Sequence, residues 1–184
     1  MLNIMLDGLP TEYEGYLIRT DFRIGMQISE ALSDVNLAYP EKMAAALSLL
    51  YGNGVPHDRE TAENGLWWFM RGGAEDEDIP ERTSGKKVFD YEQDNRLVYS
   101  AFRARFGIDL TRERLHWFAF LAMLSDVGGC SLADIMEIRG VDLSKLKDEQ
   151  QRRYADLQDK YRIKEQISDA DKARLAEFEG SLDI

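Results

Sequence analysis

Histidine is the side chain most often used for proton transfer near neutral pH, and this chain of 184 residues has only two, His57 and His116. His57 stands in a turn-rich stretch with no serine or cysteine nucleophile motif beside it, so we interpret it as a solvated loop residue. His116 lies between Leu115 and Trp117 in an apolar helical stretch, which predicts a buried, hydrogen-bonded core histidine. Neither position indicates acid–base catalysis or a zinc site.

Three carboxylates alternate at Asp90, Glu92 and Asp94, as they do at the start of an EF-hand calcium loop. That loop also requires glycine at its sixth position and glutamate at its twelfth, where this chain has Asn95 and Ala101. The pattern therefore does not predict calcium binding.

The glycine motifs that bind phosphates are incomplete. The Gly52-x-Gly54 pair lacks a third glycine and follows a predicted helix, and Gly85-Lys86-Lys87 lacks the hydroxyl residue of a phosphate loop. Cys130 is the single cysteine, which excludes an internal disulfide and fits a small buried hydrophobe in a reducing compartment. We therefore predict no catalytic, cofactor-binding or metal-binding residue, and no enzyme activity.

The charge of the chain limits its partners. A formal net charge of -11 at pH 7 works against nucleic acid, because phosphate binding needs clustered lysine and arginine, and it repels anionic membrane surfaces. The longest apolar run, residues 117–124, is far shorter than the roughly twenty residues that span a bilayer. We expect a cytoplasmic protein with neither nucleic acid nor membrane as a partner.

The hydrophobic periodicity of the chain predicts a mainly α fold. We expect a single-domain helical bundle over residues 1–184, with a small N-terminal β-hairpin and a long charged C-terminal helix. The hairpin falls in residues 1–20, where apolar residues alternate around the turn-forming Asp7-Gly8-Leu9-Pro10.

Three helices are predicted before the midpoint. Asp21 can cap the first, Pro40 can open the second, and Asp58 can cap the third. Gly52 ends the second helix and Gly72-Gly73 the third. The first carries its apolar residues at the spacing of one helical face: Ile24, Ile28, Ala31, Leu32 and Val35.

Three further helices are predicted in the second half. Asp90 caps a helix that ends at Gly107, and Thr111 caps a central helix through residues 115–124, in which every residue except His116 is apolar. Ser131 caps the last of the three, which ends at Gly140.

Two segments are expected to lie outside the core. Residues 74–87 form an acidic surface loop, because they contain four consecutive acidic residues and no periodicity. After Ser144 the chain is heavily charged and predicts a long, lightly packed helix. Ser168 can cap one short helix in a partly ordered tail over residues 168–184.

Trp68 is the one residue that we single out for partner binding. On the helix that buries Leu66 and Phe69, a rotation of about one hundred degrees per residue puts Trp68 nearly opposite the buried face. Exposed tryptophans often anchor protein interfaces. The alternative, which layered packing favours, is that the same domain covers this side of the helix as well.

A series of short motifs recurs in a fixed order along the chain: Thr20-Asp-Phe-Arg23, Trp68-Phe69 with Gly72-Gly73, Lys87-Val-Phe-Asp-Tyr-Glu-Gln-Asp94, Val98-Tyr-Ser-Ala-Phe102, Phe106-Gly-Ile-Asp-Leu110, Leu115-His-Trp117 and Ile135-Met-Glu-Ile-Arg139. In order and spacing these motifs resemble the bacteriophage gene-product-fifteen family, over about residues 17 to 162. Two departures from the family pattern, Phe118-Ala119 and Cys130 after a Gly-Gly turn, alter the packing more than the family identity.

The resemblance implies a role in the assembly of phage or prophage tails. Such proteins are typically encoded between the tail-tube and tape-measure proteins, which is the place of a tail assembly chaperone. The expected partners are the tape-measure protein and/or the tail-tube protein in the host bacterial cytoplasm, with self-association left open. The rival hypotheses are a structural tail component retained in the virion and an acidic inhibitor that mimics nucleic acid.

Overall fold

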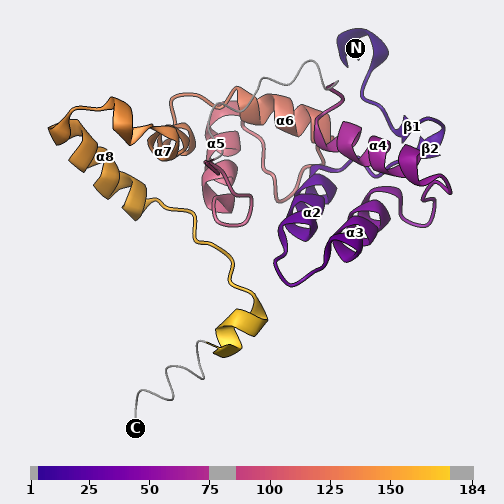
Figure 1. Ribbon diagram of the computed structural model, residues 1–184. Coiled ribbons are helices and arrows are strands. Elements are labelled where there is room, and N and C mark those ends of the chain that lie inside the picture. Colours follow the sequence, from indigo (N-terminus) through magenta and orange to yellow (C-terminus); the bar gives the residue numbers. More distant parts are fainter. Residues whose placement is uncertain (1–3, 75–85, 175–184) are drawn as a thin grey trace.

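The computed structural model describes residues 4–74 and 86–174. They form a mainly helical fold with one small antiparallel hairpin, as the periodicity predicts (Figure 1). A short helical stretch at residues 169–174 follows the named elements. Those elements are α1 (Ile4–Asp7), β1 (Glu12–Tyr13), β2 (Tyr16–Leu17), α2 (Phe22–Ser33), α3 (Tyr39–Tyr51), α4 (Arg59–Met70), α5 (Asn95–Phe106), α6 (Trp117–Ser125), α7 (Ser131–Gly140), the 3-10 turn η2 (Leu143–Lys145) and α8 (Asp148–Lys160).

The hairpin turns at a different place from the one predicted. Its central residues are Glu14 and Gly15, both with positive φ (48° and 82°), which is the geometry that two-residue hairpins require. The predicted turn at residues 7–10 was wrong, because Ile4–Asp7 coil into one helical turn instead of the first strand. Residues 1–3 of the predicted hairpin segment lie outside the described residues.

The predicted signals for α2, α3 and α4 are confirmed. The Asp21 carboxylate accepts the Arg23 N–H, and that of Asp58 accepts the Thr61 N–H at 2.8 Å. Gly52 follows α3 with φ 62°, where a Cβ would be strained. Val35, however, lies beyond the end of α2 and is 44% exposed, so its place on the buried face was wrong.

Helix starts in the second half differ from the predictions. Asp90 caps a turn through the N–H groups of Glu92 and Gln93, and α5 begins only after Asp94. Thr111 likewise donates to Asp109 within a turn instead of capping α6. Both predictions were wrong because Asp and Thr favour such local turns as readily as helix caps.

The remaining boundaries are close to those expected. Gly107 ends α5 in the left-handed conformation. Ser131 is the first residue of α7 and not its cap, a position that Cys130 holds. The Ser168 hydroxyl accepts the Asp171 N–H at 3.1 Å and so caps the stretch at 169–174. Most of the predicted acidic loop, residues 75–85, and the end of the tail lie outside the described residues.

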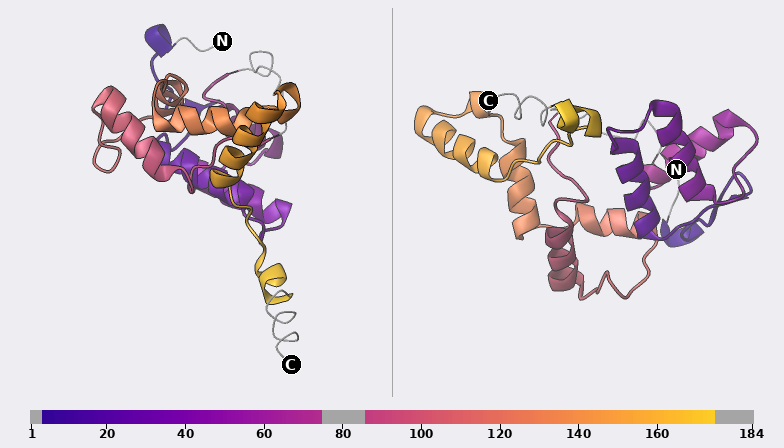
Figure 2. Two further views of the ribbon diagram at one scale, coloured as in Figure 1. Left: turned by 90° about the vertical axis from the view of Figure 1, so that its left-hand side faces the viewer. Right: turned by 90° about the horizontal axis from the view of Figure 1, so that it is seen from below.

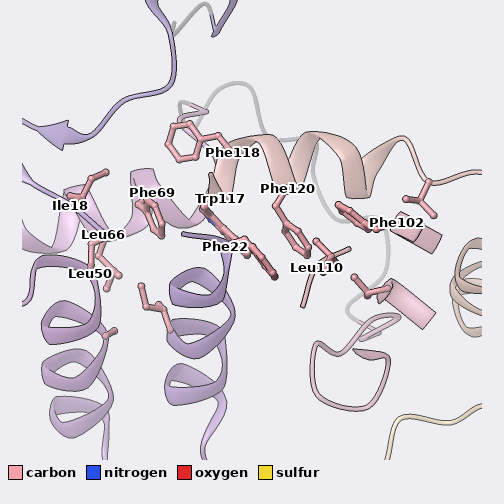
Figure 3. Close-up of a cluster of buried hydrophobic side chains, with 14 of the residues drawn as sticks. Ile18, Phe22, Leu50, Leu66, Phe69, Phe102, Leu110, Trp117, Phe118 and Phe120 are labelled. Carbon is pink, nitrogen blue, oxygen red and sulfur yellow. The ribbon is translucent and has the colours of Figure 1, made fainter. Parts of the chain in front are cut away.

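Helix α6 joins the two halves of the fold. Figure 1 shows α2, α3 and α4 gathered on one side, α5, α7 and α8 on the other, and α6 crossing between them. Its aromatic side chains continue a buried row across the molecule, in which Phe69, Trp117, Phe120 and Phe102 stack with centroid separations of 5.0 to 6.1 Å (Figure 3). Gly25 of α2 makes room for the Trp117 ring, because a Cβ there would overlap it. The prediction that this helix is central is confirmed.

Candidate partner-binding surfaces

Trp68 lies under the N-terminal hairpin. Its ring packs 5.0 Å from that of Tyr13 in β1 and edge-on, at 5.2 Å, against Phe118 of α6, so it is half-buried. The alternative that layered packing favours, that the same domain covers this side of α4 as well, is therefore confirmed. The neighbouring Trp67 is the more accessible ring, with 38% of its surface exposed. Contact between Trp68 and a partner stays a prediction.

His116 is hydrogen-bonded as predicted, but it caps α6 instead of lying within it. One ring nitrogen, Nε2, lies 2.8 Å from the Pro10 carbonyl, and the other, Nδ1, accepts the Phe118 N–H at 3.1 Å. A carbonyl only accepts and an N–H only donates, so these partners select the neutral ring with its proton on Nε2. Burial lowers the pKa of His116, which agrees with a neutral ring. Through these two hydrogen bonds, His116 links Pro10, just before the hairpin, to the start of α6.

His57 and the alternating carboxylates that begin at Asp90 form no catalytic or metal-binding group among the described residues. His57 is exposed in the loop before α4. Asp90 bonds the Lys87 ammonium at 2.6 Å and two backbone N–H groups. Burial opposes its ionisation, but these donors outweigh burial and hold the pKa of Asp90 below its usual value. In the part of the chain that the structure describes, no three His, Cys, Asp or Glu side chains are grouped to hold a metal ion.

A buried ion pair that sequence reasoning missed holds the α5–α7 side together. The Arg139 guanidinium donates hydrogen bonds to both carboxylate oxygens of Asp94, at 2.6 and 3.0 Å, and both side chains are under 10% exposed. The same guanidinium donates to the carbonyl oxygens of Val88 and Tyr161, at 3.1 and 2.6 Å. It therefore joins α7 to residues 88–94, before α5, and to Tyr161, after α8. The only signal in the sequence was an arginine next to the apolar stripe of α7.

An open groove runs along α2, and we call it the α2 groove. It consists of two adjoining clefts of about 800 and 700 Å³, which is the size range of ordinary ligand pockets, about 300–1,000 Å³. The α2 wall ends in Ser33, which lines both clefts, and residues 86–92 form the floor. Met26 of the α2 wall and Phe89 and Tyr91 of the floor line the groove with half-buried apolar side chains. Burial raises the pKa of Tyr91 to about 12, so its phenol stays neutral.

The far wall of the α2 groove is an extended segment after α8, residues 161–168, which we call the strap. The side-chain amide of Gln93 donates to the Lys164 carbonyl and accepts the Lys164 N–H, both at 2.8 Å. Further along, Asn36 at the α2–α3 turn accepts the Asp169 N–H at 2.8 Å. Figure 2 (right) shows the helical stretch after the strap beside that turn. The strap is therefore seated on polar side chains.

Within residues 4–74 and 86–174, no helix combines the length and the apolar character that crossing a bilayer would require.

Comparison with protein-family models found a match over most of the chain. A family model described as "Bacteriophage Gp15 protein" matches residues 5–163. The match reaches further toward the N-terminus than the motifs that carry the resemblance and includes the hairpin. Searches of curated proteins and of solved structures gave no significant match.

Proposed function

Because this chain belongs to the bacteriophage Gp15 protein family, and so is a phage or prophage protein, we propose that it is a non-enzymatic tail assembly chaperone. It binds the tape-measure protein and/or the tail-tube subunits in the cytoplasm of the host bacterium. The observation that carries the proposal is the family match over residues 5–163.

Two physical properties support this role. A long tape-measure protein exposes apolar helical surface before assembly, and such surface aggregates unless another protein covers it. A chain with a net charge of -11 keeps a complex soluble, because the negatively charged complexes repel one another. Grooves lined by apolar side chains, such as the α2 groove, bind amphipathic helices in other proteins. Release of the partner during assembly then needs only reversible binding.

The test is co-expression with the tape-measure protein from the same phage genome. We expect the soluble fraction of the tape-measure protein to rise and the two proteins to co-purify. An unrelated acidic helical protein of similar size is the control for nonspecific charge effects. No gain in solubility and no co-purification would contradict the proposal, and presence in purified virions at fixed stoichiometry would favour the structural role instead.

A further inference from the structure

One face of α5 carries arginine and tyrosine in a single helical stripe. Arg96, Tyr99 and Arg103 are three and four positions apart, so their side chains lie on the same side of the helix. All three are exposed, Tyr99 to 38%, and among the described residues Arg96 has no hydrogen-bond or ion-pair partner. We call these three residues the arginine face.

The loop after α5 extends this basic surface. Hydrogen bonds from Thr111 hold the pKa of Asp109 below its usual value, and the nearby charges of Arg103 and Arg112 lower it further. The Glu113 carboxylate accepts the Asp109 N–H at 3.1 Å, so both acidic side chains of the loop have local hydrogen bonds. From position 95 to 116 the chain has five arginines, no lysine and two acidic residues, which is a basic surplus in a chain of net charge -11. The guanidinium fork matches a carboxylate, and arginine and tyrosine are enriched where proteins bind one another.

The outer face of the N-terminal hairpin has the opposite charge. Glu12 pairs with Leu17 across the two strands, so both side chains lie on one face, and Tyr13 points from the other face toward α4. Leu17 is 73% exposed, and Glu14 adds a second exposed carboxylate at the turn. No lysine or arginine occurs in residues 1–18. We call Glu12, Glu14 and Leu17 the hairpin face.

The two faces are complementary but lie apart on one molecule. Each has an exposed apolar or aromatic side chain beside charges of a single sign. Figure 1 shows α5 and the hairpin on opposite sides of the molecule, with α2 and α4 between them. The hairpin face of a second copy is therefore the surface that can reach the arginine face. Elsewhere on two chains of net charge -11 like charges repel, which disfavours other orientations.

We propose that the arginine face of one copy binds the hairpin face of a second copy, head to tail. Arg96 and Arg103 donate to the carboxylates of Glu12 and Glu14, and Leu17 packs beside the Tyr99 ring. Because the two faces differ, the contact continues into a chain or closes into a ring instead of stopping at a two-fold dimer. Ion pairs between exposed side chains are individually weak, so this association depends on protein concentration. The inference does not depend on the tape-measure protein as a partner.

Charge reversal tests each face in the full-length chain. Arg96→Glu/Arg103→Glu reverses the arginine face, and Glu12→Lys/Glu14→Lys reverses the hairpin face. Two control pairs change the net charge by the same amounts at exposed positions of α7 and α8. These controls are Arg152→Glu/Arg153→Glu and Glu137→Lys/Asp156→Lys. Circular dichroism checks that every variant is folded before its association is measured.

Sedimentation equilibrium over a range of concentrations measures the association. We expect the weight-average mass of the unaltered chain to rise above that of one copy as the concentration increases. Each reversed variant should associate at least tenfold more weakly, because like charges then meet. An equimolar mixture of the two reversed variants should regain the association, since each supplies the charge that the other lacks. Both control variants should behave as the unaltered chain does.

Several outcomes would overturn the proposal. An unaltered chain that stays monomeric at every concentration would show that a second copy is not the occupant. Reversed variants that associate as strongly as their controls would show that the contact lies elsewhere. A mixture of folded reversed variants that stays monomeric would show that the two faces do not meet each other. Binding of an oligoglutamate peptide or a single-stranded oligonucleotide to the arginine face, without self-association, would assign that face to a different class of partner.

Discussion

Removal of the Arg139 side chain should be among the most damaging single changes in this fold. Arg139→Ala deletes both bonds to the Asp94 carboxylate and leaves the carbonyl oxygens of Val88 and Tyr161 without this donor. Asp94 is only 2% exposed, and among the described residues its carboxylate then keeps one hydrogen-bond donor, the Asp90 N–H at 3.0 Å. The variant therefore buries a carboxylate without a counter-ion.

The size of the effect follows from this burial. Breaking a buried ion pair by removing one partner costs about 3–5 kcal/mol, out of a total stability of about 5–15 kcal/mol for a typical domain. For a chain of this length, that loss lowers the melting temperature by roughly 6–20 °C. We expect α7 and the strap to loosen first, because Arg139 bonds both Asp94 and Tyr161.

Urea denaturation followed by circular dichroism measures this loss. Arg103→Ala is the matched control, since the Arg103 guanidinium makes an exposed bond to the Gly107 carbonyl and should contribute under about 1 kcal/mol. The double variant Asp94→Leu/Arg139→Met should recover much of the stability, because the unpaired charge is gone. An Arg139→Ala variant no less stable than Arg103→Ala would refute the reasoning.

Three further predictions concern the junction between α2, α4 and α6. Because burial lowers the folded-state pKa of His116, its neutral form stabilises the fold above about pH 6.5, and this contribution is lost as the pH falls from there toward the folded-state pKa. The free energy of unfolding should therefore fall more steeply between pH 7.5 and 5 than in His116→Asn, and parallel curves would contradict the assigned role of the ring. Gly25→Ala should cost about 2 kcal/mol or more in urea denaturation, because its Cβ overlaps the Trp117 ring, and an unchanged midpoint would show that the helices separate freely. Trp68→Ala should cost about 2–4 kcal/mol and Trp67→Ala under about 1 kcal/mol. If the folded fraction of Trp68→Ala still captured the tape-measure protein, a partner role for Trp68 would be excluded.

Local signals predicted much of the helical order. The helix caps act within one turn of their own positions, so residue type and spacing were enough to predict where these helices begin or end. These caps are Asp21, Asp58, Gly52 and Gly107. Asp90 failed because its carboxylate caps a turn that precedes the helix, a competition that the sequence does not resolve.

Long-range contacts could not be predicted in the same way. Asp94 and Arg139 stand 45 positions apart, and the residues around either one do not indicate that the other is its partner. The covering of Trp68 by Tyr13 depends on where the hairpin folds back, and that turn was itself misplaced. The α2 groove is likewise assembled from α2, residues 86–92 and the strap, which meet only in the tertiary structure.

The chaperone role is tested most directly by the soluble fraction of the tape-measure protein in induced host cells whose phage lacks this chain. The account predicts that most of the tape-measure protein becomes insoluble, and that a plasmid copy of the unaltered chain restores it. An equally soluble tape-measure protein with and without the chain would contradict the account.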